Sequence, residues 1–433
     1  MRDFYIAAAI LIIFIFTGCS GTRNRSSEPL QRSAERRDLA YIYNPSELRI
    51  HPAIKIFHTS EEQSNVLVKL FTSELLFNSA NPENRMQANV KIHYQLYQLF
   101  PPVQENALID SATYAYTIED NNTRHFETAF PVKARMPGRY MLRVYVHDVL
   151  RQEIAQQFVP VDKMNYFTNQ NYKLTDGITN ELIYNYILRG NKAYKISNNR
   201  QYSGKLYVHY YKNDSPLPPP VFSIYQPPKV PEKADSLWVY NYTQSSSFMF
   251  PYEGLYHIQT DTSEMDGLTL YNFGKRYPQV TTPEELVAPL AYITNSEEYK
   301  QLMAANNTKL AVDEFWINTT GSLDAARELL RVYYNRVFFA NYFFPSDREG
   351  WKTDRGMVYL VFGPPNAMYK SNDKEKWVYF QKQRNPELEF LFLHENSPLS
   401  NSIYNLERDD ALNYHWKKAV ASWRSGKPYI ISD

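Results

Sequence analysis

The chain has 433 residues, and its 47 Lys and Arg nearly balance its 46 Asp and Glu, which leaves a formal net charge of +1. That balance excludes an electrostatic basis for binding nucleic acid or an anionic membrane surface. With 43% hydrophobic and 21% charged residues the chain is globular rather than disordered, and its length predicts about two or three domains.

Residues 1–18 have the pattern of a secretory signal peptide. Arg2 precedes an apolar run from Phe4 to Phe16, which is too short to span a membrane comfortably as a helix. The run ends in Thr17-Gly18-Cys19, which resembles the lipobox of bacterial lipoproteins, where the cysteine is acylated and becomes the first residue. An uncleaved anchor with an incidental cysteine is the alternative.

Cys19 is the only cysteine of the chain, so the mature protein can form no internal disulfide and no cysteine-based metal site. We therefore predict lipidation at Cys19, which attaches the protein to the membrane through a lipid anchor. Residues 19–40 comprise this cysteine and a flexible tether. The residues directly after Cys19 lack the acidic cluster that often marks surface export, so the expected location is the outer membrane, facing the periplasm.

Residues 41–162 and 163–290 alternate apolar and polar side chains between turn signals, as β-strands do. The expected strands are 66–77, 88–100, 114–118 and 139–149 in the first segment, and 205–212, 222–226, 236–242 and 254–261 in the second. A turn glycine leads into a strand with a tyrosine two positions later at both Gly138-Tyr140 and Gly254-Tyr256. We predict tandem all-β, immunoglobulin-like sandwich domains; one large irregular β domain is the alternative.

The composition changes near residue 283, and residues 291–433 are predicted to form an α+β domain of ordinary size. Thr282-Pro283-Glu284-Glu285 has the cap, the proline and the acids of a helix start. Further helices are expected at 296–305, 310–317, 322–344 and 409–426, with Ser322 as the cap of the third, and strands at 377–381 and 387–395.

A Gly-Trp pair, a charged turn and an apolar run follow the longest predicted helix, in the sequence EGWKTDRGMVYLVFGPPN (349–366). Gly350 would permit a backbone conformation that Trp351 cannot adopt, and Trp351 would supply a large apolar anchor. Thr353 and Asp354 have short side chains suited to bonding turn amides. The run 357–362 predicts a strand covered on both faces, which Pro364-Pro365 would end.

These residues resemble the motif of the GWxTD-domain family, and all four of its named letters match. The resemblance covers about residues 296–430, because Trp316 upstream and Trp377 downstream lie where that family has similar features. Such proteins are bacterial, frequent in Bacteroidetes and often lipoproteins. The resemblance implies no established reaction.

Two interpretations of the motif stay open. Each of its parts has a structural explanation. Alternatively, Asp347, Arg348, Glu349, Asp354 and Arg355 form a charged rim beside Trp351 that holds a peptide carboxylate, a sugar or a partner loop. The candidate residues are Gly350, Trp351, Thr353, Asp354, Arg355, Gly363, Pro364, Pro365, Trp316 and Trp377.

No hydrolase, zinc-protease, P-loop or dinucleotide-binding motif occurs in the sequence, and no catalytic, metal or cofactor set is apparent. The expected function is that of a non-enzymatic outer-membrane lipoprotein, a scaffold or protein-binding accessory in an envelope complex for assembly, secretion or gliding. That expectation is an analogy with other anchored multidomain lipoproteins. The alternative is a periplasmic hydrolase or carbohydrate-binding protein that uses the acidic and aromatic GWxTD region, with Asp347, Glu349 and Asp354 as candidate general acids or bases. The protein partner and oligomeric state stay open.

Overall fold

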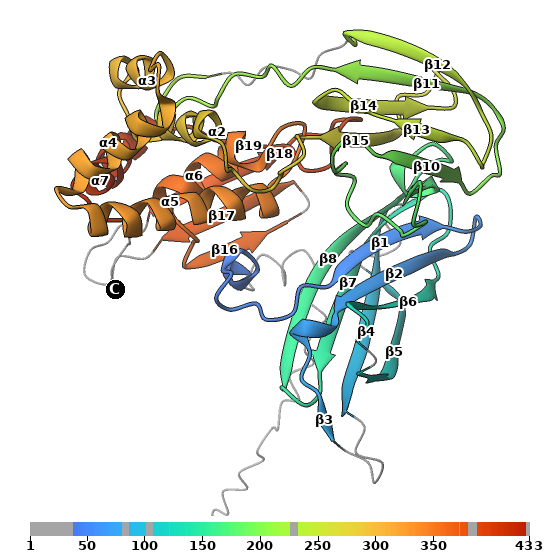
Figure 1. Ribbon diagram of the computed structural model, residues 1–433. Helices are drawn as coiled ribbons and strands as arrows, with labels where there is room; N and C mark the ends of the chain where they lie inside the picture. Colours follow the sequence, from blue (N-terminus) through green and yellow to red (C-terminus); the bar gives the residue numbers. More distant parts are fainter. Residues whose placement is uncertain are drawn as a thin grey trace, which may run out of the picture.

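The computed structural model describes residues 38–79, 86–100, 107–120, 122–225, 233–371, 373–379 and 388–429. The predicted signal peptide, Cys19 and the tether up to residue 37 lie outside these ranges. Within them, no helix is both long and apolar enough to cross a membrane. The described chain is mostly β-strand in several sheets, and most of its helices lie in the C-terminal part, away from the two β units (Figure 1).

The first β unit has two antiparallel sheets that share one hydrophobic core. Their strand orders are β1-β2-β6 and β3-β4-β7-β8, with β5 also paired to β4. Alternate residues of β4 from Ala88 to Leu96 are buried, as the sequence predicts, and share the core with Val66 and Val68. The strands are β1 (Ala53–His58), β2 (Ser64–Phe71), β3 (Asn78–Ser79), β4 (Met86–Phe100), β5 (Leu108–Glu119), β6 (His125–Val132), β7 (Gly138–Asp148) and β8 (Glu153–Lys163).

The second β unit also has two sheets around its own core, in the orders β13-β10-β9 and β12-β11-β14-β15. Tyrosine and phenylalanine fill much of this core, where Tyr256 lies between Tyr210 and Phe250. The strands are β9 (Tyr172–Asp176), β10 (Ala193–Asn198), β11 (Gly204–Tyr211), β12 (Ser236–Tyr242), β13 (Ser247–Met249), β14 (Gly254–Gln259) and β15 (Leu268–Asn272).

The strand predicted at 222–226 is wrong: residues 222–225 lie in no strand. Pro218, Pro219 and Pro220 precede them and can donate no ladder hydrogen bonds. The chain instead leaves β11 and crosses to the C-terminal helices (Figure 1), where Val221 is fully buried in the C-terminal core. We call residues 213–225 the strap.

The C-terminal unit packs helices against an antiparallel sheet of order β16-β17-β18-β19. Its strands are β16 (Ala367–Lys370), β17 (Lys374–Tyr379), β18 (Leu388–His394) and β19 (Tyr404–Leu406). Its helices are α2 (Pro283–Val287), α3 (Ser296–Met303), α4 (Thr308–Thr320), α5 (Leu323–Phe343), α6 (Asp354–Phe362) and α7 (Asn413–Arg424). The 3-10 turns of the described chain are η1 (Ala40–Tyr43), η2 (Thr72–Glu74), η3 (Asn169–Asn171), η4 (Ala288–Tyr292), η5 (Gly350–Lys352) and η6 (Asp410–Leu412).

Local capping explains why the predicted helices form where they do. Thr282 caps α2 in a capping box with Glu285, and the Ser322 hydroxyl accepts the Ala325 N–H at the start of α5. The helix predictions at 296–305, 310–317, 322–344 and 409–426 are confirmed, with ends that differ by a few residues.

The strand predicted at 357–362 is wrong, because this run forms helix α6. Every residue of α6 is buried, so its continuous apolar sequence reflects a helix covered on all sides. A short apolar run cannot by itself distinguish a buried strand from a buried helix. Thr353 caps the start of α6, and Gly363, with φ +85°, ends it.

The first described residues belong to the C-terminal unit rather than to the first β unit. The Leu39 N–H donates to Met368 O on β16 over 2.8 Å, and the Tyr359 hydroxyl donates to Tyr43 O over 3.0 Å. The Tyr43 ring packs at 4.8 Å from that of Phe344. Residues expected to belong to the tether and to the start of the first β domain thus complete a core more than 300 positions away, because |i−j| between Tyr43 and Tyr359 is 316.

Candidate functional site

The motif begins where η5 and α6 cross the end of α5 at very close range. A Cβ on Gly350 would lie 2.0 Å from Ala340 O, and one on Gly356 would lie 1.9 Å from Gly350 O. Gly350 has no left-handed φ, so the conformational role predicted for it is wrong. Both glycines are required because any side chain would collide with backbone.

Trp351 is a buried anchor, as predicted. Its ring packs edge-on to that of Tyr292 at 6.1 Å. Its backbone N–H donates to Asn341 Oδ1 over 3.1 Å, and its backbone carbonyl accepts the Tyr292 hydroxyl over 3.1 Å. These bonds join η5 to α5 and η4, and they leave the indole inside the core.

Thr353 and Asp354 lie at the start of α6 and make different contacts: Thr353 caps the helix, and Asp354 forms an ion pair. The Thr353 hydroxyl accepts the Gly356 N–H and donates to Gly350 O, which caps the helix. The Asp354 carboxylate accepts two bonds from Arg408, over 2.5 and 3.1 Å, and one from the Leu406 N–H over 2.8 Å. Asp354 therefore holds β19 and the residues after it to the helix.

Arg408 extends this contact to the strap. Its guanidinium carbon lies 4.8 Å from the ring centroid of Tyr225, and its Nη2 donates to Pro219 O over 3.2 Å. The ion pair of Asp354 and Arg408 is nearly inaccessible to solvent on both sides. Consequently the motif aspartate links α6, β19 and a segment of the second β unit through one buried cation.

Arg355 points to another buried cluster, around Glu375 on β17. The Glu375 carboxylate accepts from Arg355 Nη1 over 3.3 Å, from Lys370 Nζ over 3.2 Å and from the Trp377 indole N–H over 2.7 Å. Burial works to raise the pKa of Glu375, but the Lys370 and Arg355 cations hold that pKa below its usual value. Arg355 Nη2 also donates to Ser402 O over 3.0 Å.

The other candidate residues have structural positions. Gly363 accepts the Tyr379 hydroxyl at its carbonyl, and a Cβ there would lie 2.8 Å from Arg336 Nη2. Pro364 and Pro365 follow it, in the turn between α6 and β16. Trp316 is buried on α4, 5.4 Å from the ring of Tyr333.

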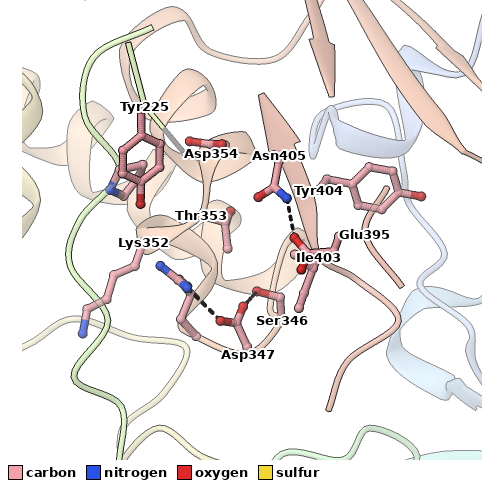
Figure 2. A pocket seen from close by; sticks show the side chains of 12 residues that line it. Tyr225, Ser346, Asp347, Lys352, Thr353, Asp354, Glu395, Ile403, Tyr404 and Asn405 are labelled. Atoms are coloured by element: carbon pink, nitrogen blue, oxygen red, sulfur yellow. Dashed lines mark hydrogen bonds and ion pairs between the residues drawn. The ribbon is translucent and has the colours of Figure 1, made fainter. Parts of the chain in front are cut away.

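A recess lies between the motif and the strap, with a volume of only about 40 Å³. Figure 2 shows Tyr225 of the strap on one side and Asn405 with Glu395 on the other. It can hold a few water molecules, whereas pockets for organic ligands usually measure about 300 Å³ or more. Its lining residues are Pro218, Tyr225, Ser346, Asp347, Arg348, Lys352, Thr353, Asp354, Glu395, Ile403, Tyr404 and Asn405.

The acids of the recess are engaged within the protein. Asp347 accepts from Arg348 over 2.8 Å and from the Ser346 hydroxyl over 2.8 Å, and Glu395 accepts from Asn405 Nδ2 over 2.5 Å (Figure 2). Glu349 forms an ion pair with Lys352. The five charged residues expected to form one rim thus lie in separate internal pairs.

Sequence reasoning missed the partners that organise the motif, above all Arg408 and Tyr225. No local pattern marks either, because both come from loops. Glu375 carried a weak signal, since it shares an inward face of β17 with Trp377 and Tyr379 by the period-two rule. Among the described residues, no group of three or more His, Cys, Asp and Glu side chains could hold a metal ion.

No curated protein matches the chain. A similar solved structure is a candidate β-galactosidase from Bacteroides fragilis, with 15% identity and a TM-score of 0.18. The likeness covers 32% of this chain and 19% of that one, and so low a TM-score carries no argument about fold or function.

The family model of the GWxTD domain matches residues 254–425. The match includes β14 and β15 of the second β unit, and it continues through the whole set of C-terminal elements to the end of α7. It also includes Gly350, Trp351, Thr353 and Asp354, which the structure joins to α5, β19 and the strap. Residues 254–425 of this chain are therefore a GWxTD domain.

Proposed function

We propose that this chain is a non-enzymatic scaffold of the bacterial envelope, anchored by a lipid at Cys19 to the outer membrane, where it faces the periplasm and binds a protein partner. The observation that carries the proposal is the fate of the motif side chains: Trp351, Asp354 and Arg355 are all buried and bonded within the chain. A motif used in this way builds a rigid platform.

The engagement of Asp354 supports scaffolding over hydrolysis. A general acid or base needs a proton-accepting position at the substrate, and both carboxylate oxygens of Asp354 accept bonds from Arg408. The recess beside it holds about 40 Å³, too little for a sugar ring or a peptide. An envelope complex for assembly, secretion or gliding is the setting that we propose by analogy.

The edge position of strand β12 is evidence for a protein partner rather than a small ligand. It stands at the end of its sheet and pairs with β11 in the described chain, so its other edge offers backbone N–H and C=O groups. Leu237 and Val239 on it are each 51% exposed, opposite His209 and Tyr207 of β11. An extended segment of a partner could add here as another strand.

The first described residues indicate which part of the molecule the anchor would hold. Asp38 and Leu39 bond to Met368 on β16, over 3.0 and 2.8 Å. The chain from Cys19 to Asp38 can reach at most about 65 Å. The C-terminal unit would therefore be tied to the membrane, while β12 lies on the second β unit, free to meet a partner.

We also infer that the two β units are immunoglobulin-like sandwiches. The Tyr140 hydroxyl donates to Arg135 O over 2.5 Å, and the Tyr256 hydroxyl donates to Tyr252 O over 2.8 Å. A tyrosine that bonds back to the backbone a few residues upstream is a feature of immunoglobulin-like sandwiches. The same feature in both units supports the tandem arrangement.

The test is a pull-down of the lipidated protein from native membranes with two double variants. Leu237→Lys with Val239→Lys places charges on the β12 face, whereas Leu310→Lys with Leu323→Lys changes leucines of nearly equal exposure, 51% and 52%, on α4 and α5. We expect a stoichiometric partner with the parent and the α4/α5 variant and its loss with the β12 variant, while all three melt alike. Retention of the partner by the β12 variant would refute this surface.

The anchor is tested separately. Cys19→Ser removes the acylated thiol, so the protein should move from the membrane fraction to the soluble periplasmic fraction. Continued retention in the membrane fraction would contradict lipid anchoring at Cys19. It would leave the β12 surface open to its own test.

A further inference from the structure

A cavity of about 280 Å³ lies where the three parts of the described chain meet. β1 and β8 contribute from the first β unit, Tyr186 and Tyr271 from the second, and the turn at 400–402 from the C-terminal unit. Sites for small ligands occur preferentially at such junctions. This volume is seven times that of the recess beside the motif (280 against 40 Å³).

The cavity contains one charged lining residue, Lys55 of β1, which is only 3% exposed. Its Nζ has no hydrogen-bond partner in the part of the chain that the structure describes. The amine lies 3.6 Å from the ring centroid of Tyr186, another lining residue. Nζ itself is inaccessible to solvent, covered on one side by this ring, and it lacks the acceptor that a buried ammonium normally has.

We propose that this cavity binds a small organic acid, whose carboxylate draws the Lys55 ammonium away from the Tyr186 ring and pairs with it, and whose apolar body packs among the tyrosines. A single cation matches a monocarboxylate in charge, whereas a phosphate dianion would call for further donors. The lining includes Tyr184, Tyr186, Val159 and Pro345 for the body of the ligand. Asn169 and Ser402 offer additional polar groups.

The volume sets the size of the ligand. A cavity of about 150 Å³ accepts benzene, so this one would hold about a dozen non-hydrogen atoms. That range includes a free acid such as benzoate and also the last residue of a peptide with its terminal carboxylate. Both present the same chemistry to Lys55, and this inference does not depend on the proposed scaffold function.

Binding should depend on pH in a defined way. Burial lowers the pKa of Lys55 to about 7. The other titratable groups of the lining are Tyr184, Tyr186 and Tyr271, and burial raises the pKa of each above its usual value, so they stay neutral. Above pH 7 the acid must bind together with one proton, which Nζ takes up, and its affinity should fall about tenfold per pH unit.

The experiment is calorimetric titration of the isolated full-length protein with benzoate, phenylacetate and N-acetyl-Gly-Phe, each compared with its neutral amide. We expect the acids to bind and the amides to fail, with uptake of one proton at pH 8. Binding of the free acids would identify a metabolite site, whereas binding of N-acetyl-Gly-Phe alone would identify a site for a chain end. Both results support the carboxylate chemistry.

Two variants make the test specific. Lys55→Met should fold and lose at least tenfold in affinity. Lys173→Met is the control, because Lys173 Nζ also lies over an aromatic ring, that of Phe57 at 4.0 Å, outside the cavity lining. Equal binding by Lys55→Met and the parent, equal binding of acids and amides, or no binding by any of the three acids would each overturn the proposal.

Discussion

At the scale of single residues, the buried charges of this protein differ in how completely they are paired. Glu375 meets two cations and an indole N–H, and Asp354 meets both arms of Arg408 and a backbone N–H. Lys55 Nζ lies over the face of Tyr186 and has no hydrogen-bond partner among the described residues. A buried charge is costly without a partner. The charges of Glu375 and Asp354 are therefore compensated by their neighbours, whereas that of Lys55 is not.

Removing the charge of Glu375 should therefore strongly destabilise the folded protein. Glu375→Gln keeps an acceptor for the Trp377 indole but leaves the guanidinium of Arg355 buried without a counter-charge. We expect the free energy of unfolding to fall by about 3 kcal/mol or more, measured by urea denaturation. Because the pKa of Glu375 is held low, its contribution is present at neutral pH and is lost as the pH falls through the folded-state pKa.

The matched control lies on the same sheet. Glu389 on β18 pairs with Lys376 on β17 over 2.7 Å, with both side chains largely open to solvent. Glu389→Gln should cost less than about 1 kcal/mol, as is usual for exposed ion pairs. Similar losses for the two variants would show that burial does not govern the Glu375 cluster.

Removing the amine of Lys55 should have the opposite effect and stabilise the folded protein. Its pKa is lowered from 10.5 to about 7, so between these values the unfolded chain holds a proton that the folded protein lacks. The stability of the parent should therefore rise with pH in this window, by about 1.4 kcal/mol per unit at most. Lys55→Met lacks this slope and should be more stable than the parent at pH 7, with a difference that shrinks towards pH 10.

Thermal melts of both proteins across this pH range would measure the effect. Lys309→Met is a suitable reference, because the Lys309 ammonium is exposed and its ion pair with Asp313 lies at the surface. A parallel pH dependence for parent and Lys55→Met would exclude a depressed lysine pKa.

At the scale of elements, the sequence predicted best what local chemistry decides. The caps at Thr282 and Ser322 mark α2 and α5, because the groups that they satisfy lie within three residues. Helix α6 was not predicted, because its burial on every side depends on tertiary packing. The run at 357–362 has the composition of a buried strand as much as that of a buried helix.

The crossing of α5, η5 and α6 depends on two glycines, which makes it testable. Gly356→Ala would put a methyl group 1.9 Å from a backbone oxygen, so α6 must shift, at an expected cost of about 3 kcal/mol. Gly321→Ala is the comparison, because that residue has φ +71° but meets nothing within 4 Å. It should cost only about 1 kcal/mol, from backbone strain.

Chemical denaturation followed by tryptophan fluorescence would measure both variants, since Trp351 lies next to this crossing. Equal losses would mean that the contact of Gly356 with Gly350 relaxes at little cost. A much larger loss for Gly356→Ala would establish that this glycine sets the distance between α6 and η5.

At the scale of the whole molecule, the candidate site was only partly predictable. The sequence identified Trp351, Thr353 and Asp354, because they stand together in one short segment. It could not identify Arg408 or Tyr225, since their meeting with Asp354 requires a chain path from the second β unit across to the C-terminal helices. Pairings over such separations depend on tertiary structure that no local pattern encodes.

The strap is the element through which the whole molecule can be tested. Val221 is fully buried in the C-terminal core, and its carbonyl accepts the Asp409 N–H over 3.3 Å, whereas Ile224 on the same segment is entirely exposed. Val221→Ala removes buried methyl groups and should weaken the attachment by about 2 kcal/mol. Ile224→Ala should change nothing, because it empties no packed site.

Hydrogen–deuterium exchange read by mass spectrometry would locate the effect. Amides of residues 213–225 and 405–412 should exchange faster in Val221→Ala, because the strap opens more often, while those of the first β unit keep the parental rates. If the strap alone loosens, it is a detachable contact and Asp354 with Arg408 suffices to hold the C-terminal unit together. If β11 and β12 loosen with it, then the second β unit and the C-terminal unit unfold as one body.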